Sequence, residues 1–206
     1  MMSVLLRPPH RALRPAQASL VTTAFALGAV DAVARTVGVA LAVKWPNDLV
    51  VVGDDHSGPG YRKIAGILTE SVVSGGEIAA LVVGMGMNTG WGAMPPDLRD
   101  QAASLDDLSG AAVSRPDLMV EVLRRFEVRY RTLLAEGGPA KTIEQAIGAS
   151  ATVGRRVTVD LGGGDVVVGT AAGLDPEGGL LLRSDAGTTQ VVTMGEVVHL
   201  RPLPPS

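Results

Sequence analysis

Two short segments of the sequence carry residue types that could bind an anion and move a proton. In Lys44–Asp48 (KWPND), a proline and two polar residues interrupt an apolar run, and this pattern predicts a turn that ends at Asp48. Lys63 opens the next long apolar run (RKIAGIL). A lysine at a strand start is a compact cation suited to a phosphate or carboxylate, and Asp48 could balance it or accept a proton. A solvated lysine and an Asx turn are the ordinary alternatives, and the local patterns leave them open.

Three glycines mark positions where a ligand could approach the backbone. Gly66 lies inside the run that Lys63 opens, and Gly84 and Gly86 precede Asn88 in GMGMN at the end of the following run. Glycine weakens a strand unless something must come close to its backbone. In a regular strand, Lys63 and Gly66 would lie on opposite faces. The glycines and Asn88 therefore predict room for a flat ligand, or else a β-bulge followed by a polar turn.

The composition limits the chemistry open to the chain. The 206 residues are 46% hydrophobic and 19% charged, which favours one folded domain, or one with a small appendage, over disorder. The net charge is −3, and neither the part before residue 150 nor the part after it is basic, so we expect no nucleic-acid partner. The absence of cysteine excludes a thiolate zinc site and a cysteine nucleophile, and three separated histidines predict no metal site. The glycines match neither the dinucleotide fingerprint nor a phosphate-binding P-loop.

The apolar runs are interrupted too often to predict a membrane segment. The run at residues 20–34 contains Thr22, Thr23 and Asp31, and no run reaches the ~18 to 20 apolar residues that a membrane-spanning helix needs. The first residues lack the charged start and long apolar region of a secretory signal. We therefore expect no membrane partner and a cytoplasmic location.

The elements expected to position these residues are strands and helices. Apolar runs bounded by turn residues predict strands at residues 2–6, 39–43, 49–52, 63–73 and 78–83. The continuous run at 39–43 is typical of a central strand, and Gly75-Gly76 predicts a hairpin. Helical patterns cover residues 18–37, 114–136 and 140–147, the second opening on Ser114 as its cap. Residues 88–104 are interpreted as a loop.

The pattern changes near residue 150. Five short β-type runs follow, at residues 153–161, 166–172, 179–182, 189–192 and 197–200, with glycine-rich turns between them and no helical periodicity. About 50 residues with this spacing are typical of an SH3-like barrel. We expect two domains, at residues 1–149 and 150–206.

In combination and in this order, three motifs resemble the catalytic domain of biotin protein ligases. They are KWPND at 44–48, RKIAGILTE at 62–70 and VGMGMN at 83–88. The stretch from VGRRV at 153 to GEVVHLR at 195–201 is similar to that family's small C-terminal barrel. The resemblance covers nearly the whole chain.

The resemblance implies an α/β fold with a mixed sheet, similar to class II aminoacyl-tRNA synthetases and lipoate ligases. It implies that biotin is activated with ATP and Mg²⁺ as biotinyl-5′-AMP and then transferred to a lysine of a biotin carboxyl-carrier domain, with a homodimer left open. Carried over residue by residue, it assigns catalysis to Lys63 and Asp48, biotin contact to Lys63, Gly66 and Gly84, and nucleotide contact to Asn47, Gly86 and Asn88.

The chain departs from the family pattern at two places. The hairpin before Lys63 carries an extra loop at residues 53–61, which is expected to point into solvent. The Ser-Thr pair and the Gly-Arg-rich loop of the family, which precede the first strand, have no match here, so this chain alone is expected to bind biotin weakly. No N-terminal DNA-binding domain is matched, so no repressor role is expected. The alternatives are a truncated or degenerate relative that binds a nucleotide or a carrier without catalysis, and a lipoate-type ligase, which KWPND and the barrel disfavour.

Overall fold

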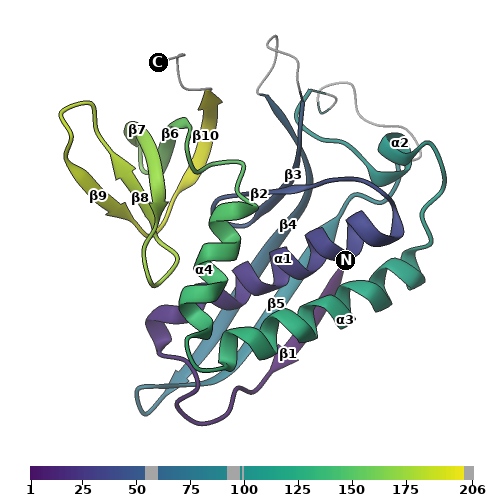
Figure 1. Ribbon diagram of the computed structural model, residues 1–206, viewed down its shortest axis with the longest axis horizontal. Helices are drawn as coiled ribbons and strands as arrows, with labels where there is room; N and C mark the ends of the chain where they lie inside the picture. Colours follow the sequence, from purple (N-terminus) through teal and green to yellow (C-terminus); the bar gives the residue numbers. More distant parts are fainter. Residues whose placement is uncertain (54–59, 92–97, 99, 202–206) are drawn as a thin grey trace.

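The structure, a computed structural model, contains two antiparallel sheets (Figure 1). It describes residues 1–53, 60–91, 98 and 100–201, and only the backbone of 198–201. Most of the extra hairpin loop predicted at 53–61 lies outside the described residues.

The first sheet has five strands in the order β1-β5-β4-β3-β2. These strands are β1 (Met2–Leu6), β2 (Ala42–Lys44), β3 (Asp48–Val52), β4 (Tyr61–Ser74) and β5 (Glu77–Met87). The long β4–β5 hairpin forms its centre and turns at Gly75-Gly76, where both glycines have positive φ, as the sequence predicts.

Two expectations for this sheet are wrong. The apolar run at 39–43 was expected to form a central strand, but β2 is a three-residue edge strand. Its apolar side chains are buried instead by the helices and by the C-terminal part of the chain. All neighbouring strands of the sheet are antiparallel, so the sheet is not mixed; the parallel pairings among the described residues are isolated bridges at Val43–Ser150 and Lys63–Ala102.

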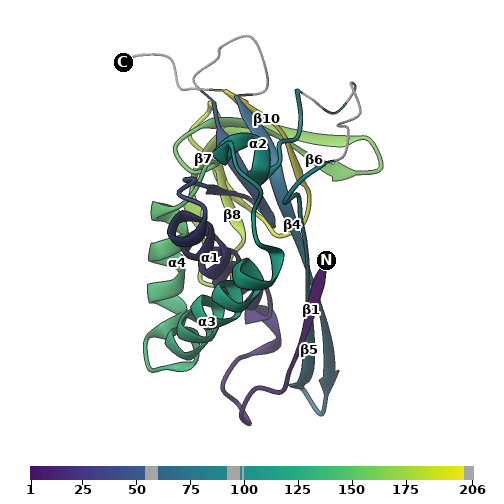
Figure 2. The ribbon, with the colours of Figure 1, turned by 90° about the vertical axis from the view of Figure 1, so that its right-hand side faces the viewer.

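The helices cover one face of this sheet and leave the other face open (Figure 2). They are the 3-10 turn η1 (Pro15–Gln17), α1 (Ser19–Thr36), α2 (Leu105–Ser109), α3 (Arg115–Leu134) and α4 (Gly138–Gly148). Ser114 caps α3 by accepting a hydrogen bond from the Asp117 amide, as predicted from the sequence.

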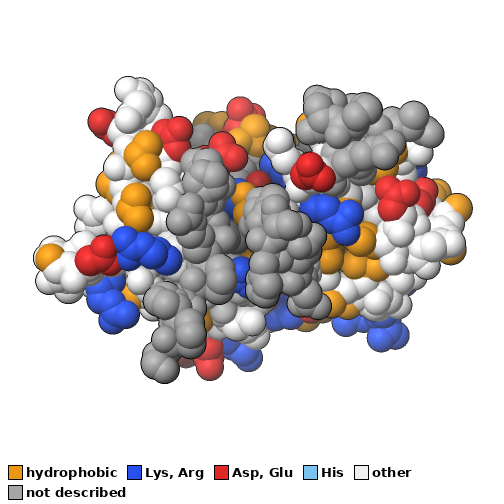
Figure 3. Space-filling model, turned by 90° about the horizontal axis from the view of Figure 1, so that it is seen from above, with side chains coloured by type: hydrophobic (Ala, Val, Ile, Leu, Met, Phe, Trp, Pro, Cys, Tyr) orange, Lys and Arg blue, Asp and Glu red, His pale blue; other side chains and the backbone are white. Residues whose placement is uncertain are grey.

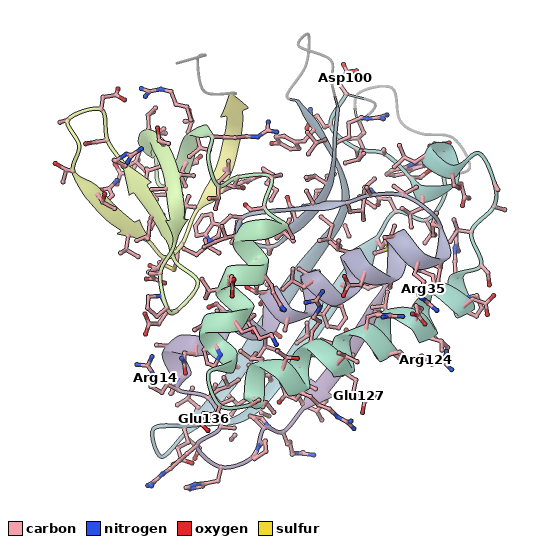
Figure 4. All side chains as sticks on the ribbon, viewed as in Figure 1. Arg14, Arg35, Asp100, Arg124, Glu127 and Glu136 are labelled. Atoms are coloured by element: carbon pink, nitrogen blue, oxygen red, sulfur yellow. The ribbon has the colours of Figure 1, made fainter. Side chains whose placement is uncertain are left out.

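The contact between α1 and α3 is close because Gly28 faces α3. A Cβ at Gly28 would lie 2.7 Å from the backbone nitrogen of Phe126, so only glycine fits. Phe25 then packs on Phe126 with ring centroids 4.6 Å apart. At the solvent edge of the pair, Glu121 lies 3.6 Å from Arg35 and 3.9 Å from Arg124 (both arginines are labelled in Figure 4). Both arginine side chains are exposed, so these pairs add little stability.

The segment Pro15–Thr36 is, by length and composition, long and apolar enough to cross a membrane. It is the one such helix among the described residues, and most of it is buried between the sheet and α3. Its apolar character is therefore explained by its place in the core.

The second sheet contains the five short strands predicted after residue 150, in the order β10-β6-β7-β8-β9. They are β6 (Arg156–Gly162), β7 (Asp165–Leu174), β8 (Leu180–Arg183), β9 (Thr189–Val192) and β10 (Glu196–Arg201). All four pairings are antiparallel, and no helix interrupts them.

The connection between the two sheets is hydrogen-bonded to β2. The Val43 amide donates to Ala149 and its carbonyl accepts from Ala151, both at 2.8 Å. The Trp45 amide donates to Thr152 Oγ1 and its indole Nε1 to the Gly178 carbonyl, both at 3.0 Å. The connection thus holds β2, and the connection and the β7–β8 turn together hold Trp45 of KWPND.

Candidate active site

Lys63 and Asp48 form an ion pair at the open face of the first sheet. Lys63 Nζ lies 2.6 Å from Asp48 Oδ1, and the lysine side chain is about half exposed while the aspartate is nearly buried. Seen from above, acidic and basic side chains are interspersed around this end of the molecule (Figure 3). The two residues that the sequence singled out for chemistry therefore meet directly.

A β-bulge brings Lys63 and Gly66 to the same face, which corrects the expectation that they lie on opposite faces. Asp48 is paired with Gly66, but Val50 is paired with Lys63, so Ile64 is an extra residue in β4. The lysine side chain therefore extends over Gly66. A Cβ there would lie 3.3 Å from Lys63 Cε and Nζ, so glycine leaves the lysine room.

Lys44 approaches Asp48 from the buried side. Its Nζ lies 3.8 Å from Asp48 Oδ2, and only 3% of the lysine side chain is exposed. The ammonium also lies 4.9 Å from the centre of the Tyr61 ring. Burial lowers the pKa of Lys44, against the attraction of Asp48 and Glu196, which raises it. Burial, together with Asp48, raises the pKa of Tyr61.

The two asparagines are held by β4. Asn47 Nδ2 donates to the Ile67 carbonyl (2.7 Å), and the Ile67 amide donates back to the Asn47 carbonyl (3.0 Å). The Asn88 amide donates to the Ile64 carbonyl (2.8 Å), and its Nδ2 lies 3.3 Å from the Lys63 carbonyl. Within the described part of the chain neither amide oxygen accepts a hydrogen bond, so both could accept one from a ligand.

The predicted site residues other than Asp48 line two adjoining hollows, and Asp48 reaches them only through its ion pair with Lys63. One, of about 360 Å³, includes Asn47, Gly66, Gly84 and Gly86 in its lining. The other, of about 520 Å³, is lined by Lys63, Gly66, Gly86 and Asn88 among others. Gly66 and Gly86 lie where the hollows meet, so Asn47 and Asn88 belong to different ends of the site.

The glycines differ in what surrounds them. A Cβ at Gly86 would meet no atom within 4 Å, and at Gly84 it would be in ordinary contact with Ser3 Oγ at 3.6 Å. The described residues therefore leave open space over Gly86, and a glycine there leaves that space above the sheet free for a ligand.

Sequence reasoning missed the second lysine and part of the backbone around the first. In the sequence, Lys44 stands out only as part of the KWPND motif. The apolar run before it does not indicate whether the lysine that follows will be buried. The Lys63 amide donates to Gln101 (2.7 Å) and its carbonyl accepts from Ala103 (3.0 Å), within the segment expected to be a loop. The long-range pairing of that segment has no local sequence signal.

The arrangement suits chemistry between two anions. The half-exposed ammonium of Lys63, held by Asp48, lines the larger hollow and lies over Gly66, which lines both hollows. There it could offset the repulsion between a carboxylate and a phosphate. A glycine-lined sheet face with two amide groups could hold a flat, mostly apolar ligand. The fold and site together suit a class of protein that brings a carboxylate and a phosphate together on the open face of an antiparallel sheet, with helices on its other face.

Comparison with known proteins agrees with this class. The family described as "Biotin/lipoate A/B protein ligase family" matches residues 1–88, and "Biotin protein ligase C terminal domain" matches residues 152–200. The biotin–[acetyl-CoA-carboxylase] ligase of Paracoccus denitrificans is 32% identical over 206 residues, which cover 95% of this chain and 78% of that protein. The corresponding ligase of Mycobacterium tuberculosis is 35% identical over 178 residues, 85% of this chain and 60% of the relative.

The chain belongs to the biotin protein ligase family. It spans about half the length (55%) of two matching relatives, the bifunctional ligase/repressors BirA of Bacillus spizizenii and Bacillus subtilis. The fold is also that of a biotin protein ligase from Aquifex aeolicus, with a TM-score of 0.77 at 22% identity over 97% of this chain and 80% of that one.

Proposed function

We propose that this protein activates biotin with ATP as biotinyl-5′-AMP and transfers it to a lysine of a biotin carboxyl-carrier domain. The observation that carries this proposal is the Lys63–Asp48 ion pair, whose lysine lines the larger hollow and lies over Gly66, a residue that lines both hollows. Family membership supports it, since a related Aquifex aeolicus ligase has been solved in complex with biotin and ATP.

In the first step, a biotin carboxylate oxygen attacks the α-phosphorus of ATP. A new phosphorus–oxygen bond forms, the bond to the β-phosphate breaks, and pyrophosphate leaves. Lys63 offsets the charge of the carboxylate and the phosphate as they approach, and Asp48 holds its ammonium in place. Gly66 and Gly84 are the biotin-contacting positions in this proposal, and Asn47, Gly86 and Asn88 the nucleotide-contacting ones.

The geometry refines one of these assignments. Asn47 lines the hollow that contains Gly84, whereas Asn88 lines the hollow that contains Lys63. Asn47 therefore lies better placed for biotin, or for supporting the Asp48 corner, than for the nucleotide.

In the second step, the amine of the carrier lysine attacks the acyl carbon of the adenylate. The new amide bond forms, the bond to the phosphate oxygen breaks, and AMP leaves. Asp48 is the group proposed to accept the proton that the amine loses.

Mg²⁺ belongs to the proposal through the nucleotide. The described residues contain no cluster of three or more His, Cys, Asp or Glu side chains that could hold a metal by themselves. Mg²⁺ commonly binds through substrate phosphates and waters with one or two carboxylates, so it would arrive as MgATP.

The remaining expectations are part of the same proposal. We propose domains at residues 1–149 and 150–206, the second an SH3-like barrel, with a cytoplasmic location and a homodimer left open. The β10-β6-β7-β8-β9 sheet supports the barrel, since curling this sheet would bring β9 toward β10.

The proposal is tested by biotin-dependent exchange of labelled pyrophosphate into ATP, followed by transfer to a purified carrier domain, in the full-length protein. Lys63→Ala is expected to reduce adenylate formation by about 100-fold or more, with unchanged thermal unfolding because the lysine is half exposed. Lys141→Ala, at an exposed helical lysine away from the site, is the matched control. Near-normal exchange by Lys63→Ala would refute the mechanism. Absence of exchange in the unmodified protein would indicate a non-catalytic relative.

A further inference from the structure

Lys44 is a buried cation that the proposed reaction does not use. It lies on β2, is paired across the strands with Asp48, and faces that carboxylate from the side opposite Lys63. Asp48 thus has one ammonium at each oxygen, at 2.6 Å on the exposed side and 3.8 Å on the buried side.

Burying a lysine at this position is costly for folding. Ionised groups lose hydration when they are buried, and apolar replacements of buried ion pairs are often neutral or stabilising. The strand around Lys44 is otherwise apolar and packs against core residues of both sheets. A lysine in such a place is better explained by what it does to Asp48 than by stability.

We propose that Lys44 is a positioning residue that fixes Asp48 and supplies the excess positive charge of the anion site. Lys44 holds Asp48 Oδ2, so that Oδ1 stays aimed at Lys63. With both lysines protonated, the three side chains carry a net charge of +1, whereas Asp48 and Lys63 alone would cancel. This inference rests on the proposed function for its place in the reaction, but its electrostatic part concerns any phosphate-bearing ligand.

The protonation of Lys44 then controls affinity for anions. Among the described side chains, the groups that face it are Asp48 on β3, Tyr61 and Lys63 on β4, and Glu196 on β10. Since burial holds the pKa of Lys44 below its usual value, it loses its proton at a lower pH than an exposed lysine. Anion binding should weaken over that pH range.

Binding of inorganic pyrophosphate tests the electrostatic part without any catalysis. Calorimetric titration of the full-length protein should show Lys44→Met binding pyrophosphate about tenfold more weakly than the unmodified protein, and without the weakening at alkaline pH. Lys141→Met removes one lysine of the same charge from an exposed helix and is expected to bind as the unmodified protein does. Equal affinity of all three proteins would overturn the inference.

A double-mutant cycle tests whether Lys44 acts through Asp48. Lys44→Met is expected to lower kcat of pyrophosphate exchange by up to about 100-fold, with a smaller change in KM for biotin. In an Asp48→Asn background, the same substitution should have little further effect, because the carboxylate that Lys44 holds is already gone. If the loss of kcat in the double variant equals the product of the losses in the two single variants, Lys44 acts independently of Asp48. That result would refute the positioning role.

The outcomes separate this inference from the proposed function. If the unmodified protein and Lys141→Met exchange pyrophosphate and Lys44→Met does so equally well, the inference fails and the function stands. If none of the three proteins exchanges, the proposed function fails, and the titration still decides whether Lys44 supplies the charge. Thermal unfolding of each variant shows that any loss does not come from a damaged fold.

Discussion

Asp48 connects a buried lysine to an exposed one, and its position depends on neighbours from three strands. Lys44 precedes it on β2, it opens β3, and both Gly66 and Lys63 lie beside it on β4. The aspartate is nearly buried, so its carboxylate cannot turn freely toward water. A carboxylate held this way keeps the half-exposed Lys63 in one place before any ligand arrives, which reduces the entropy lost on binding.

At the residue scale, Gly86 provides a direct test of ligand space. Gly86→Val should leave the fold intact, because a Cβ at this position meets nothing within 4 Å and a β-branched residue suits a strand. Biotin and nucleotide binding should be lost, since the side chain would occupy the junction of the two hollows. Calorimetry with each ligand and thermal unfolding measure the two effects.

Gly148→Val is the matched control for this substitution. It also adds a side chain into open space, but at the end of α4, away from the hollows. If Gly86→Val binds both ligands as this control does, the site has been placed on the wrong part of the sheet.

At the element scale, the link between the two sheets stabilises the turn that presents Asp48. Thr152 is fully buried, and its hydroxyl accepts the Trp45 amide at 3.0 Å. The β7–β8 turn contributes a second bond from the indole Nε1 of Trp45 to the Gly178 carbonyl, and Glu177 pairs with Arg14 at 2.8 Å beside it (Figure 4). The C-terminal sheet therefore supports the site although none of the predicted site residues lies on it.

We expect Thr152→Val to destabilise the protein by about 1 to 3 kcal/mol, since it leaves the buried Trp45 amide without a partner. Thr152→Ser keeps the hydroxyl and should recover most of that loss. Urea unfolding of the two variants measures the difference. Equal stability of the valine and serine variants would mean that the hydrogen bond contributes nothing measurable.

At the scale of the whole molecule, the buried lysine should appear in the pH dependence of stability. The pKa of Lys44 is lowered in the folded state, so the unfolded chain binds more protons between the folded value and the ordinary value of 10.5. The contribution of this residue to the free energy of unfolding therefore rises as pH increases through that range. Below that range, the cost of burying the charged lysine is fully present.

Chemical unfolding of the unmodified protein and of Lys44→Met over this pH range tests the sign. Near neutral pH, Lys44→Met should be at least as stable as the unmodified protein. The difference in free energy of unfolding between the two proteins should become smaller as pH increases. The comparison uses the difference between the two proteins, because the raised pKa of Tyr61 lowers the stability of both above about pH 10. A difference that grows with pH would contradict the assignment of a charged, buried Lys44.

The sequence by itself determined the elements and the residues worth testing. Periodicity, caps and glycine turns predicted the β4–β5 hairpin, the cap of α3 and the five strands after residue 150, because these depend on local spacing and backbone preference. The motifs also selected Asp48 and Lys63, which the fold brings into an ion pair, and Asn88, whose side chain lies 3.3 Å from the Lys63 carbonyl.

Tertiary structure alone decided how those residues face one another. The bulge at Ile64 moves Lys63 onto the face of Gly66. The alternation of side chains along a regular strand does not predict such an extra residue, because the bulge arises in the pairing with β3. The edge position of β2 and the burial of Lys44 depend on helices and a second sheet that are distant in sequence. Burial and register arise from such long-range packing, so a local pattern could select the chemistry but not its geometry.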